Sequence, residues 1–338
     1  MKSNKLKLAV IGATGLVGRT MIKVLEERRI EVADFFPIAS AKSRGSKLTL
    51  AGREYEVTTP EDGLWKIADV ALLSPGAKVS AQWIPPLAAA GVVCIDNSSA
   101  FRLDAKVPLV VPEVNPEAIR QGDLIIANPN CSTIQMVVAL APLHREFSLE
   151  EVVVATYQSA AGAGQKGKNQ LLNEMDGKTT LSSPFPHPLF HNVIPAIGSF
   201  GDDGYCKEER KMILETRKIM NLPSLRVFPT TVRVPIAHCH GEAAHLRFKK
   251  NLTPKQAGDV LKSAKGIKIL DDPRQNVYPL PAECFDQDAV FIGRIRQAPG
   301  EDHTLDLWIV ADNLRKGAAT NAVQILELIL ARGLMKAG

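Results

Sequence analysis

Residues 6–18 read LKLAVIGATGLVG, and this segment says more about the fold than any other in the chain. The apolar run over 6–11 predicts a buried parallel strand, and the apolar residues after Gly18 recur at helical spacing. A strand, a glycine-rich turn and a helix in this order are typical of a dinucleotide-binding βαβ unit, whose helix N-terminus receives the pyrophosphate. The segment therefore predicts a Rossmann-type, doubly wound parallel sheet.

The second predicted strand, residues 35–40, ends without the acidic residue that would bind the ribose 2′-hydroxyl of NAD. The chain continues as SAKSRG over 40–45, and its hydroxyl and cationic side chains suit a 2′-phosphate instead. A solvated basic loop would have a similar composition, but the preceding glycine turn makes a nucleotide site the better interpretation. The segment therefore predicts NADP as the cofactor.

Two further buried strands are predicted over 70–74 and 92–96, and each leads into polar residues. Ligands in doubly wound sheets bind beyond the carboxyl ends of the strands, so Ser74, Asn97 and Arg102 are expected to face one crevice. A single arginine is most often a surface residue. In this position Arg102 is instead a candidate anion clamp, because a guanidinium matches a phosphate or carboxylate in a bidentate way.

Residues 126–134, IANPNCSTI, place a cysteine at the start of a predicted helix. The apolar run over 124–127 predicts a strand, Asn-Pro-Asn favours a turn, and the later apolar residues recur at helical spacing. Unpaired backbone N–H groups and the helix dipole favour an anion there, such as a thiolate, and provide donors for a developing oxyanion. A buried core cysteine is the alternative. We interpret Cys131 as a nucleophile.

The chain after Cys131 changes character and predicts a second, α+β domain. Strand-like segments cover 151–158, 225–248, 289–296 and 304–310, and the last two suggest antiparallel additions to one sheet. The strongly apolar helix after Asn321 must be buried, and we expect it to return to the first domain. The predicted organisation is a discontinuous NADP-binding domain, 1–130 with 313–338, and a catalytic and oligomerisation domain, 131–312, whose sheet is mixed and largely antiparallel.

Three polar clusters in the second domain are candidates for binding or catalysis. Gln158 ends a strand before a small-residue loop, where it either satisfies buried backbone groups or orients a substrate. Glu208 and Lys211 lie at i and i+3 on one helix face, which by default is a solvated ion pair. If their segment is extended, His238 and His240 share a strand face. No third metal ligand is in sight, so a single general base is a better interpretation than a metal pair.

Composition narrows the classes of partner and compartment. The 338 residues carry a net charge of +5 without a block of Lys or Arg, which suits small anionic ligands and gives no case for nucleic acid or a membrane. The five cysteines are dispersed and form no CxxC pair, which disfavours a zinc site and suits a reducing cytosol. The segment 182–201 is long for a loop, and we expect it to be functional or a subunit arm.

Several motifs in a fixed order together resemble the aspartate-semialdehyde dehydrogenase family over nearly the whole chain. They are GATGLVG from Gly12, SSAFR ending at Arg102, NPNCST around Cys131, YQSAAGAG from Tyr157, GYCKEERKM from Gly204, VRVP around Arg233, CHGE from Cys239 and the terminal DNLRKGAA. The resemblance implies a cytoplasmic homo-oligomer of two-domain subunits, with a dimer favoured. Its reaction would interconvert L-aspartate 4-semialdehyde, phosphate and NADP with 4-phospho-L-aspartate and NADPH, in the synthesis of lysine, methionine, threonine and diaminopimelate.

The resemblance also implies roles for individual residues. Cys131 would be the acyl-thioester nucleophile and His240 the acid/base, with Gln158 orienting the substrate. The substrate would be held by Arg102, Asn130, Gln158, Glu208, Lys211 and Arg233, with Arg233 on the α-carboxylate, Glu208 on the ammonium, and Arg102 and Lys211 on the phosphate. The cofactor would be lined by Gly12, Thr14, Gly15, Leu16, Val17, Ser40, Ser43, Arg44, Ser74, Ala161, Gly162 and Asn313. Gly241 departs from the family pattern, which usually has serine after this histidine.

In the implied mechanism the Cys131 thiolate attacks the acyl phosphate and expels phosphate, and hydride from NADPH then reduces the thioester. His240 supplies a proton as the aldehyde forms, and backbone N–H groups at the helix start stabilise the oxyanion. N-acetyl-glutamyl-phosphate reductase shares this fold and chemistry, but an acid at Glu208 and the NPNCST surround argue against it. A non-catalytic nucleotide-binding paralogue is disfavoured by the co-presence of Cys131, Gln158, Arg233 and His240.

Overall fold

The computed structural model describes residues 6–178 and 183–334. These residues form two compact units. The first comprises those up to Pro129 together with those from Ala318 onward, and the second runs from Asn130 to Gly317. None of the described helices is long and apolar enough to cross a lipid bilayer.

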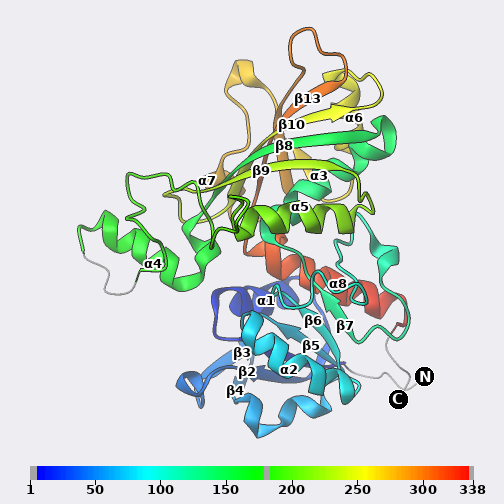
Figure 1. Ribbon diagram of the computed structural model, residues 1–338. Coiled ribbons are helices and arrows are strands. Elements are labelled where there is room, and N and C mark those ends of the chain that lie inside the picture. The colour runs from blue at the N-terminus through cyan, green and yellow to red at the C-terminus, as the bar shows by residue number, and fades with distance from the viewer. Residues whose placement is uncertain (1–5, 179–182, 335–338) are drawn as a thin grey trace. The chain divides into compact units, whose positions relative to one another are not determined.

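A parallel sheet forms the centre of the first unit, with five strands in the described part of the chain (Figure 1). The strands lie in the order β2-β1-β5-β6-β7, and every neighbouring pair runs parallel. Their bounds are β1 (Leu6–Ile11), β2 (Val32–Ile38), β5 (Val70–Leu73), β6 (Val93–Asp96) and β7 (Ile125–Ala127), with a separate hairpin of β3 (Lys47–Leu50) and β4 (Arg53–Glu56). The doubly wound parallel sheet predicted from the glycine turn is confirmed.

Helices cover both faces of this sheet. α1 (Leu16–Glu27) and α8 (Thr320–Ala331) share one apolar core with it, whereas α2 (Ala77–Ala89) packs into the other. Arg28 on α1 donates hydrogen bonds of 2.8 and 2.7 Å to the carboxylate of Glu327 on α8. The side-chain amide of Asn321 donates to the carbonyl oxygen of Val110 at 2.9 Å. The terminal helix is therefore held to the first unit by both apolar burial and polar contacts.

The second unit is built on a mixed sheet with six strands among the described residues, ordered β11-β12-β13-β10-β8-β9. The pairs β8–β9 and β11–β12 are parallel, and the other neighbours are antiparallel, so the predicted mixed and largely antiparallel sheet is confirmed. The strands are β8 (Leu149–Gln158), β9 (Arg226–Arg233), β10 (His240–Phe248), β11 (Ile267–Ile269), β12 (Val290–Arg296) and β13 (Thr304–Ala311). The helices are α3 (Cys131–Phe147), α4 (Gly164–Met175), α5 (Lys207–Ile219), α6 (Pro254–Ser263) and α7 (Pro281–Cys284).

The two faces of the second sheet differ. α3 packs against the central strands and α5 runs along β9 on the same side (Figure 1). Successive side chains of a strand point to opposite faces, so Val154 and Thr156 of β8 are buried while Val153 and Tyr157 are 43% and 39% exposed. The sheet therefore has one covered face, which holds the polar side chains described below, and one face that displays large apolar side chains.

The segment from Leu225 to Phe248 is not one continuous strand. β9 and β10 both pair with β8, one parallel and one antiparallel, so the chain must cross over β8 between Arg233 and His240. The crossing includes Cys239 in the left-handed region at φ 65°. The expectation that His238 and His240 share a strand face is therefore wrong, and the His238 ring instead packs 4.3 Å from the ring of Phe285.

The long loop is irregular, as its composition predicts. Ser182 lies outside the described residues, and 183–201 contains no helix or strand in the part that the structure describes. Phe185, Leu189 and Ile194 bury their side chains in a small apolar cluster. Ile194 also exchanges backbone hydrogen bonds of 2.9 and 2.8 Å with Arg233. The loop therefore supports the end of β9, where one of the predicted substrate residues lies.

Candidate functional site

Three of the predicted site residues lie side by side across adjacent strands of the second unit. Gln158 of β8 is opposite His240 of β10 on one side and Arg233 of β9 on the other. Their exposed fractions are 1%, 0% and 5%, respectively. Gln158 and Arg233 end their strands and His240 begins its own, so the antiparallel and parallel pairings align the three residues in one row. This row of Arg233, Gln158 and His240 is referred to below as the sheet-end row.

The hydrogen bonds of His240 define its tautomer. The backbone N–H of Ser159 donates to Nδ1 at 3.0 Å, so a neutral ring carries its proton on Nε2. Nε2 is buried and has no hydrogen-bond partner among the described residues. Burial, with a further contribution from the charge of Arg233, lowers the pKa of His240 to about 3. At neutral pH the imidazole is therefore uncharged and presents an N–H donor.

Arg233 is held firmly at the other end of the row. Its Nη1 donates to the carbonyl oxygen of Ser159 at 2.5 Å, and its guanidinium lies 5.6 Å from the ring centroid of Phe185. A Cβ atom at Gly162 would come 2.7 Å from Arg233 Nη1 and 3.3 Å from His240 Nε2, so only glycine permits this approach. Burial lowers the pKa of Arg233, while the charges of Glu208 and Cys131 raise it.

Cys131 is the first residue of α3, as the sequence predicts. Asn130 caps the helix, and its Oδ1 accepts hydrogen bonds from the N–H groups of Ser132 at 3.0 Å and Thr133 at 3.2 Å. The cap therefore occupies two of the N–H groups at the helix start, and stabilisation of an oxyanion by the other N–H groups there stays a prediction. A Cβ atom at Gly317 would lie 2.9 Å from the Cβ of Cys131, so Gly317 packs closely behind the thiol.

Glu208 links the cysteine helix to the sheet-end row. Its Oε1 accepts from Asn130 Nδ2 at 2.7 Å and from Gln158 Nε2 at 3.1 Å, and its Oε2 accepts from Lys211 Nζ at 3.0 Å. Burial alone would raise the pKa of Glu208, but the Lys211 charge and the three hydrogen bonds lower it to about 2. The pair is therefore only partly solvated, because the Glu208 carboxylate is buried while the Lys211 side chain is one-third exposed.

Asn130 holds neighbouring protein groups with both ends of its amide. Besides the cap and the bond to Glu208, its own backbone N–H donates to the Glu215 carboxylate at 2.6 Å. The geometry makes Asn130 the residue that positions Cys131. Its predicted contact with substrate stays a prediction, as does that of Lys211, whose side chain is one-third exposed beside Glu208.

Arg102 belongs to the first unit. Its guanidinium donates to the carbonyl oxygens of Asn128 and Asn97, each at 2.9 Å, and the side chain is buried. Ser74 and Asn97 follow β5 and β6, which are neighbouring parallel strands, so both lie at the same edge of the sheet. The structure thus brings Arg102 to Asn97 as expected, and its phosphate-binding role stays a prediction.

The glycine turn of the first unit fits a dinucleotide. Gly12 has φ 87°, and a Cβ there would come 3.0 Å from the backbone of Ser74. A Cβ at Gly18 would lie 2.2 Å from the carbonyl oxygen of Gly12. Gly15 precedes α1 and gives it no side-chain cap, and the buried Ser74 hydroxyl has no partner among the described residues. A compact backbone, a helix start at Leu16 without a side-chain cap, and a hydroxyl without a partner suit a pyrophosphate.

The basic loop lies next to this turn. The Thr14 and Ser43 hydroxyls are 3.1 Å apart, and Ser40 directly precedes the short helical turn that carries Ser43. Arg44 forms an ion pair of 2.8 Å with Asp62 and is 61% exposed. In the second unit, Ala161 and Gly162 belong to the turn after β8, and Asn313 Oδ1 accepts from the Ser159 hydroxyl at 3.1 Å. The structure brings Thr14 and Ser43 together, and cofactor contacts by all of these residues stay predictions.

Sequence reasoning missed the residues that support the site from behind. Ser159 sets the His240 tautomer, Phe185 covers Arg233, and Glu215 and Gly317 hold the start of α3. Ser159 and Gly317 lie within the YQSAAGAG and DNLRKGAA motifs, which do not reveal these supporting roles, whereas Phe185 and Glu215 lie outside the quoted motifs. Within the described residues, no group of three or more His, Cys, Asp or Glu side chains is arranged to hold a metal ion.

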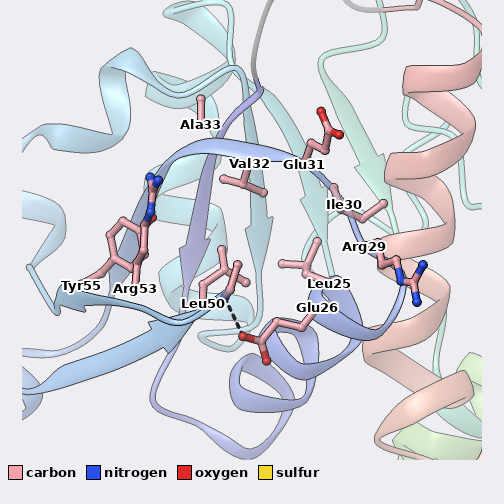
Figure 2. A pocket seen from close by; sticks show the side chains of 11 residues that line it. Leu25, Glu26, Arg29, Ile30, Glu31, Val32, Ala33, Leu50, Arg53 and Tyr55 are labelled. Carbon is pink, nitrogen blue, oxygen red and sulfur yellow. Dashed lines mark hydrogen bonds between the residues drawn. The ribbon is translucent and has the colours of Figure 1, made fainter.

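A cavity of about 600 Å³ opens elsewhere on the first unit (Figure 2). It lies between the end of α1, the start of β2 and the β3–β4 hairpin, and none of the predicted site residues lines it. Figure 2 shows Leu25, Ile30 and Leu50 on its apolar side, with Arg29 and Arg53 at its margins. The cavity is therefore distinct from the glycine turn.

Comparisons with known proteins identify the family. A family model described as "Semialdehyde dehydrogenase, NAD binding domain" matches residues 7–122, and one described as "Semialdehyde dehydrogenase, dimerisation domain" matches residues 140–316. The aspartate-semialdehyde dehydrogenase of Aquifex aeolicus is 48% identical, over 97% of this chain and 99% of that protein. The chain belongs to the aspartate-semialdehyde dehydrogenase family. Another relative, aspartate-semialdehyde dehydrogenase 2 of Vibrio cholerae, is 44% identical over 97% of this chain and 98% of its own length.

A solved structure from the same family has a closely similar fold. Aspartate-semialdehyde dehydrogenase II from Vibrio cholerae, crystallised as a complex with ASA, superposes with a TM-score of 0.93 at 43% identity. The superposition covers 97% of this chain and 99% of that one. The likeness therefore extends over both units.

Proposed function

We propose that this protein reduces 4-phospho-L-aspartate to L-aspartate 4-semialdehyde with NADPH, reversibly, and releases inorganic phosphate. The observation that carries the proposal is Cys131 at the start of α3, joined through Asn130 and Glu208 to Gln158 in the sheet-end row. The names of the curated relatives support the same reaction. In the cell the product would feed the synthesis of lysine, methionine, threonine and diaminopimelate.

The first unit would hold the cofactor, and the second would carry the covalent chemistry. The glycine turn from Gly12 to Val17 would take the pyrophosphate, and Ser40, Ser43 and Arg44 would take the 2′-phosphate that distinguishes NADP. Contacts of Ala161, Gly162 and Asn313 with the cofactor stay predictions. When bound, NADPH supplies the hydride that reduces the acyl carbon.

Cys131 would form the covalent bond to substrate. Its sulfur attacks the acyl carbon, the C–S bond forms, and the bond from that carbon to the phosphate oxygen breaks, so phosphate leaves with the electron pair. The guanidinium of Arg233 would hold the α-carboxylate, Glu208 would accept from the ammonium, and Lys211 would face the phosphate. Because Glu208 already bonds to Gln158 and Asn130, substrate binding would tighten an existing network.

His240 would act through its Nε2–H group. The imidazole is neutral at working pH and Nδ1 is occupied by the Ser159 N–H, so Nε2 donates to the substrate oxygen as negative charge develops there. This donor would replace the helix N–H groups that the Asn130 cap occupies. The C–S bond would then break as the C=O bond of the aldehyde re-forms, the Cys131 sulfur would take the electron pair, and the Nε2–H group would only have to hydrogen-bond to the oxygen.

N-acetyl-glutamyl-phosphate reductase is the competing function within the same chemistry. The buried Glu208 carboxylate, with its pKa of about 2, favours a substrate with a free ammonium over one with an acetylated nitrogen. Offering the purified protein both semialdehydes with phosphate and NADP, and following absorbance of NADPH, separates the two. Faster turnover of the N-acetylated glutamate semialdehyde would overturn the proposal.

The central experiment is phosphate-dependent reduction of NADP by L-aspartate 4-semialdehyde. Cys131→Ser should lower turnover by about 10³-fold or more, because serine is a far weaker nucleophile without a base beside it. NADP binding, measured by fluorescence titration or calorimetry, should be unchanged. Retention of most activity in this variant would refute the nucleophile, and loss of NADP binding would show that the substitution disturbs more than the thiol.

We also propose that the protein forms a homodimer and that it is located in the cytoplasm. The uncovered sheet face of the second unit displays Val153, Tyr157 and Phe228, the last 45% exposed, and the family model for this region is a dimerisation domain. All five cysteines are unlinked, which suits a reducing compartment. Light scattering should give the mass of two chains, and Phe228→Glu should shift it toward one. A monomeric wild-type protein would refute the assembly.

A further inference from the structure

A buried carboxyl group lies beside the site without a role in the proposed chemistry. Glu242 is on β10, two residues after His240 and on the same face, and it is 0% exposed. It is paired across the sheet with Thr156 on β8 and Ile309 on β13. Neither of its carboxyl oxygens has a hydrogen-bond partner in the described part of the chain. An ionised carboxylate in this position would be very costly.

One polar side chain of α3, Gln135, interacts with Glu242. The Gln135 amide acts on the Glu242 carboxyl and lowers its pKa, which only partly offsets the larger raising effect of burial. Neither carboxyl oxygen has a partner of good geometry among the described residues. The Oε1 atom of Gln135 is also buried and without a partner among the described residues, while its Nε2 donates to the carbonyl oxygen of His240 at 3.4 Å. Gln135 Oε1 and both Glu242 oxygens are thus buried atoms without a partner in the described part of the chain, and all three are acceptors when Glu242 is ionised.

The charged groups of the surrounding elements do not neutralise Glu242. Arg233 and His240 belong to the sheet-end row, which is the next set of paired residues from Glu242 on the same sheet face. There Arg233 donates to Ser159, and His240 is uncharged. α5 contributes the carboxylate of Glu208, whose charge is already matched by Lys211. The Thr156 hydroxyl donates to Gln158 rather than to the acid. α3 contributes the thiol of Cys131, which is no counter-cation, and no ion pair in the described residues involves Glu242.

We propose that Glu242 is a neutral carboxylic acid whose O–H donates to Gln135 Oε1, and that Gln135 thereby positions His240. One proton satisfies both orphaned groups, since the acid becomes a donor and the amide oxygen its acceptor. With Oε1 fixed, Nε2 of Gln135 is directed at the His240 carbonyl. That carbonyl follows Cys239, whose φ of 65° must be stabilised by its surroundings. Glu242 is therefore a positioning residue, two steps removed from the reacting atoms.

The protonation has a thermodynamic consequence with a definite sign. Burial raises the pKa of Glu242 well above its usual range, so the folded chain holds this proton longer than the unfolded chain does. The acid therefore stabilises the fold fully at low pH, and that stabilisation is lost as pH rises above the unfolded pKa. Glu242→Gln has no proton to lose. Its stability relative to the wild type should therefore increase steadily from about pH 6 to pH 9.

Infrared difference spectroscopy tests the protonation directly and does not depend on the proposed reaction. The spectrum of the wild type minus that of Glu242→Gln, at neutral pH, should show the C=O stretch of a protonated carboxylic acid that shifts in D₂O. Glu208→Gln is the matched control and should remove a carboxylate band instead. A carboxylate band for Glu242, or a stability difference that depends on added Na⁺ or K⁺, would overturn the proposal in favour of an ionised group with a bound cation.

Enzyme kinetics test whether Glu242 positions His240 through Gln135. Of the experiments in this subsection, only this one rests on the proposed function. Glu242→Leu should lower kcat about tenfold with the KM for NADP unchanged, because Gln135 loses its anchor. Glu242→Gln, whose amide can donate to Gln135, should recover most of that loss. Gln135→Leu should behave like Glu242→Leu, and combining the two should cost little more than either alone. Additive losses, or equal losses for the Gln and Leu variants, would refute a route through Gln135.

Discussion

The glycine turn of the first unit and the sheet-end row of the second place functional groups by opposite means. The turn is one contiguous segment that exposes its backbone. Its geometry requires glycine at positions 12 and 18, where a Cβ atom would collide with neighbouring backbone. The row consists of large side chains from three strands, each nearly or fully buried. Gln158 donates to Glu208 of α5, whereas His240 and Arg233 are both held by the backbone of Ser159. One site is defined by local chain sterics and the other by strand register.

This difference predicts how each site responds to substitution. In the turn an added methyl group acts directly on the backbone that would approach a ligand. In the row a lost side chain removes a reacting or binding group and leaves the partner unsatisfied inside the protein. Variants in the row should therefore change turnover, whereas variants in the turn should change nucleotide affinity. The following predictions test whether turnover and nucleotide affinity respond separately to variants in the row and in the turn.

The largest effect is expected at His240. His240→Gln should lower kcat by about 10²-fold or more, because a flexible amide replaces the imidazole N–H that the Ser159 N–H holds in place, while the affinity for NADP stays within experimental error. Stopped-flow turnover and calorimetric titration with NADP give the two values. A tenfold weaker binding of NADP with little change in kcat would contradict the separation between row and turn.

The same variant carries a pH dependence. The pKa of His240 is lowered on folding to about 3, so as pH falls below its usual value of 6.5 the unfolded chain takes up the proton first and stability is lost. His240→Gln has no imidazole, so it should lack this loss of stability at low pH. Urea unfolding at about pH 8 and about pH 5 should show the wild type weakening more than His240→Gln over this interval. Parallel weakening of the two proteins would count against a buried, neutral ring.

The second prediction concerns the turn. Gly18→Ala would place a methyl carbon 2.2 Å from the Gly12 carbonyl oxygen, so the turn must shift. Overpacking of this kind costs about 1–3 kcal/mol, and NADP affinity should fall by about tenfold or more while acylation of Cys131 by the acyl phosphate proceeds normally. Gly258→Ala is the matched control, because a Cβ at that helical glycine meets nothing within 4 Å. Normal NADP binding by Gly18→Ala would refute the role of close packing.

The two regions also differ in how much of them the sequence predicts. The glycine turn, the strand before it and the helix after it lie within one short segment, so the local residue pattern predicts all three. The local pattern also predicts Cys131 at the start of a helix. The row requires the pairing of β8 with both β9 and β10, which no local pattern contains. Extrapolating alternation through His238 failed because it assumed one strand where the chain crosses another. Ser159 and Glu242 lie within the YQSAAGAG and CHGE motifs, but their roles could not be predicted because these arise only from three-dimensional neighbours.

Gly241 tests whether the row depends on residues that point away from it. The family usually has serine here, but a Cβ at Gly241 would lie 2.5 Å from the Trp308 ring, on the sheet face opposite His240. Gly241→Ala should therefore destabilise the fold by about 1–3 kcal/mol through overpacking, with kcat changed less than stability. Trp308→Leu in the same chain should recover part of the stability. A large loss of kcat without a stability change would show that Gly241 acts on His240 directly.

The smallest effect is expected at Arg44, where the basic loop meets solvent. Arg44 is paired with Asp62 at 2.8 Å, and an exposed pair of this kind contributes little because water and salt screen it. Arg44→Ala should therefore lower the preference for NADP over NAD, measured as the ratio of kcat/KM values, by about twofold to fivefold. The reduction should shrink as salt is added, since a screened charge has less to lose.

Asp62→Asn sharpens this prediction because it should act in the opposite direction. The asparagine oxygen can still accept the hydrogen bond that the Thr59 N–H gives to Asp62 at 2.9 Å, so the turn that carries it is kept. The negative charge that competes for Arg44 is removed, and the guanidinium becomes available to a 2′-phosphate. The NADP preference should then rise. If Arg44→Ala and Asp62→Asn lower the NADP preference equally, the charge of Arg44 does not set that preference. The loop over 40–45 would then act through its backbone conformation, as the glycine turn does.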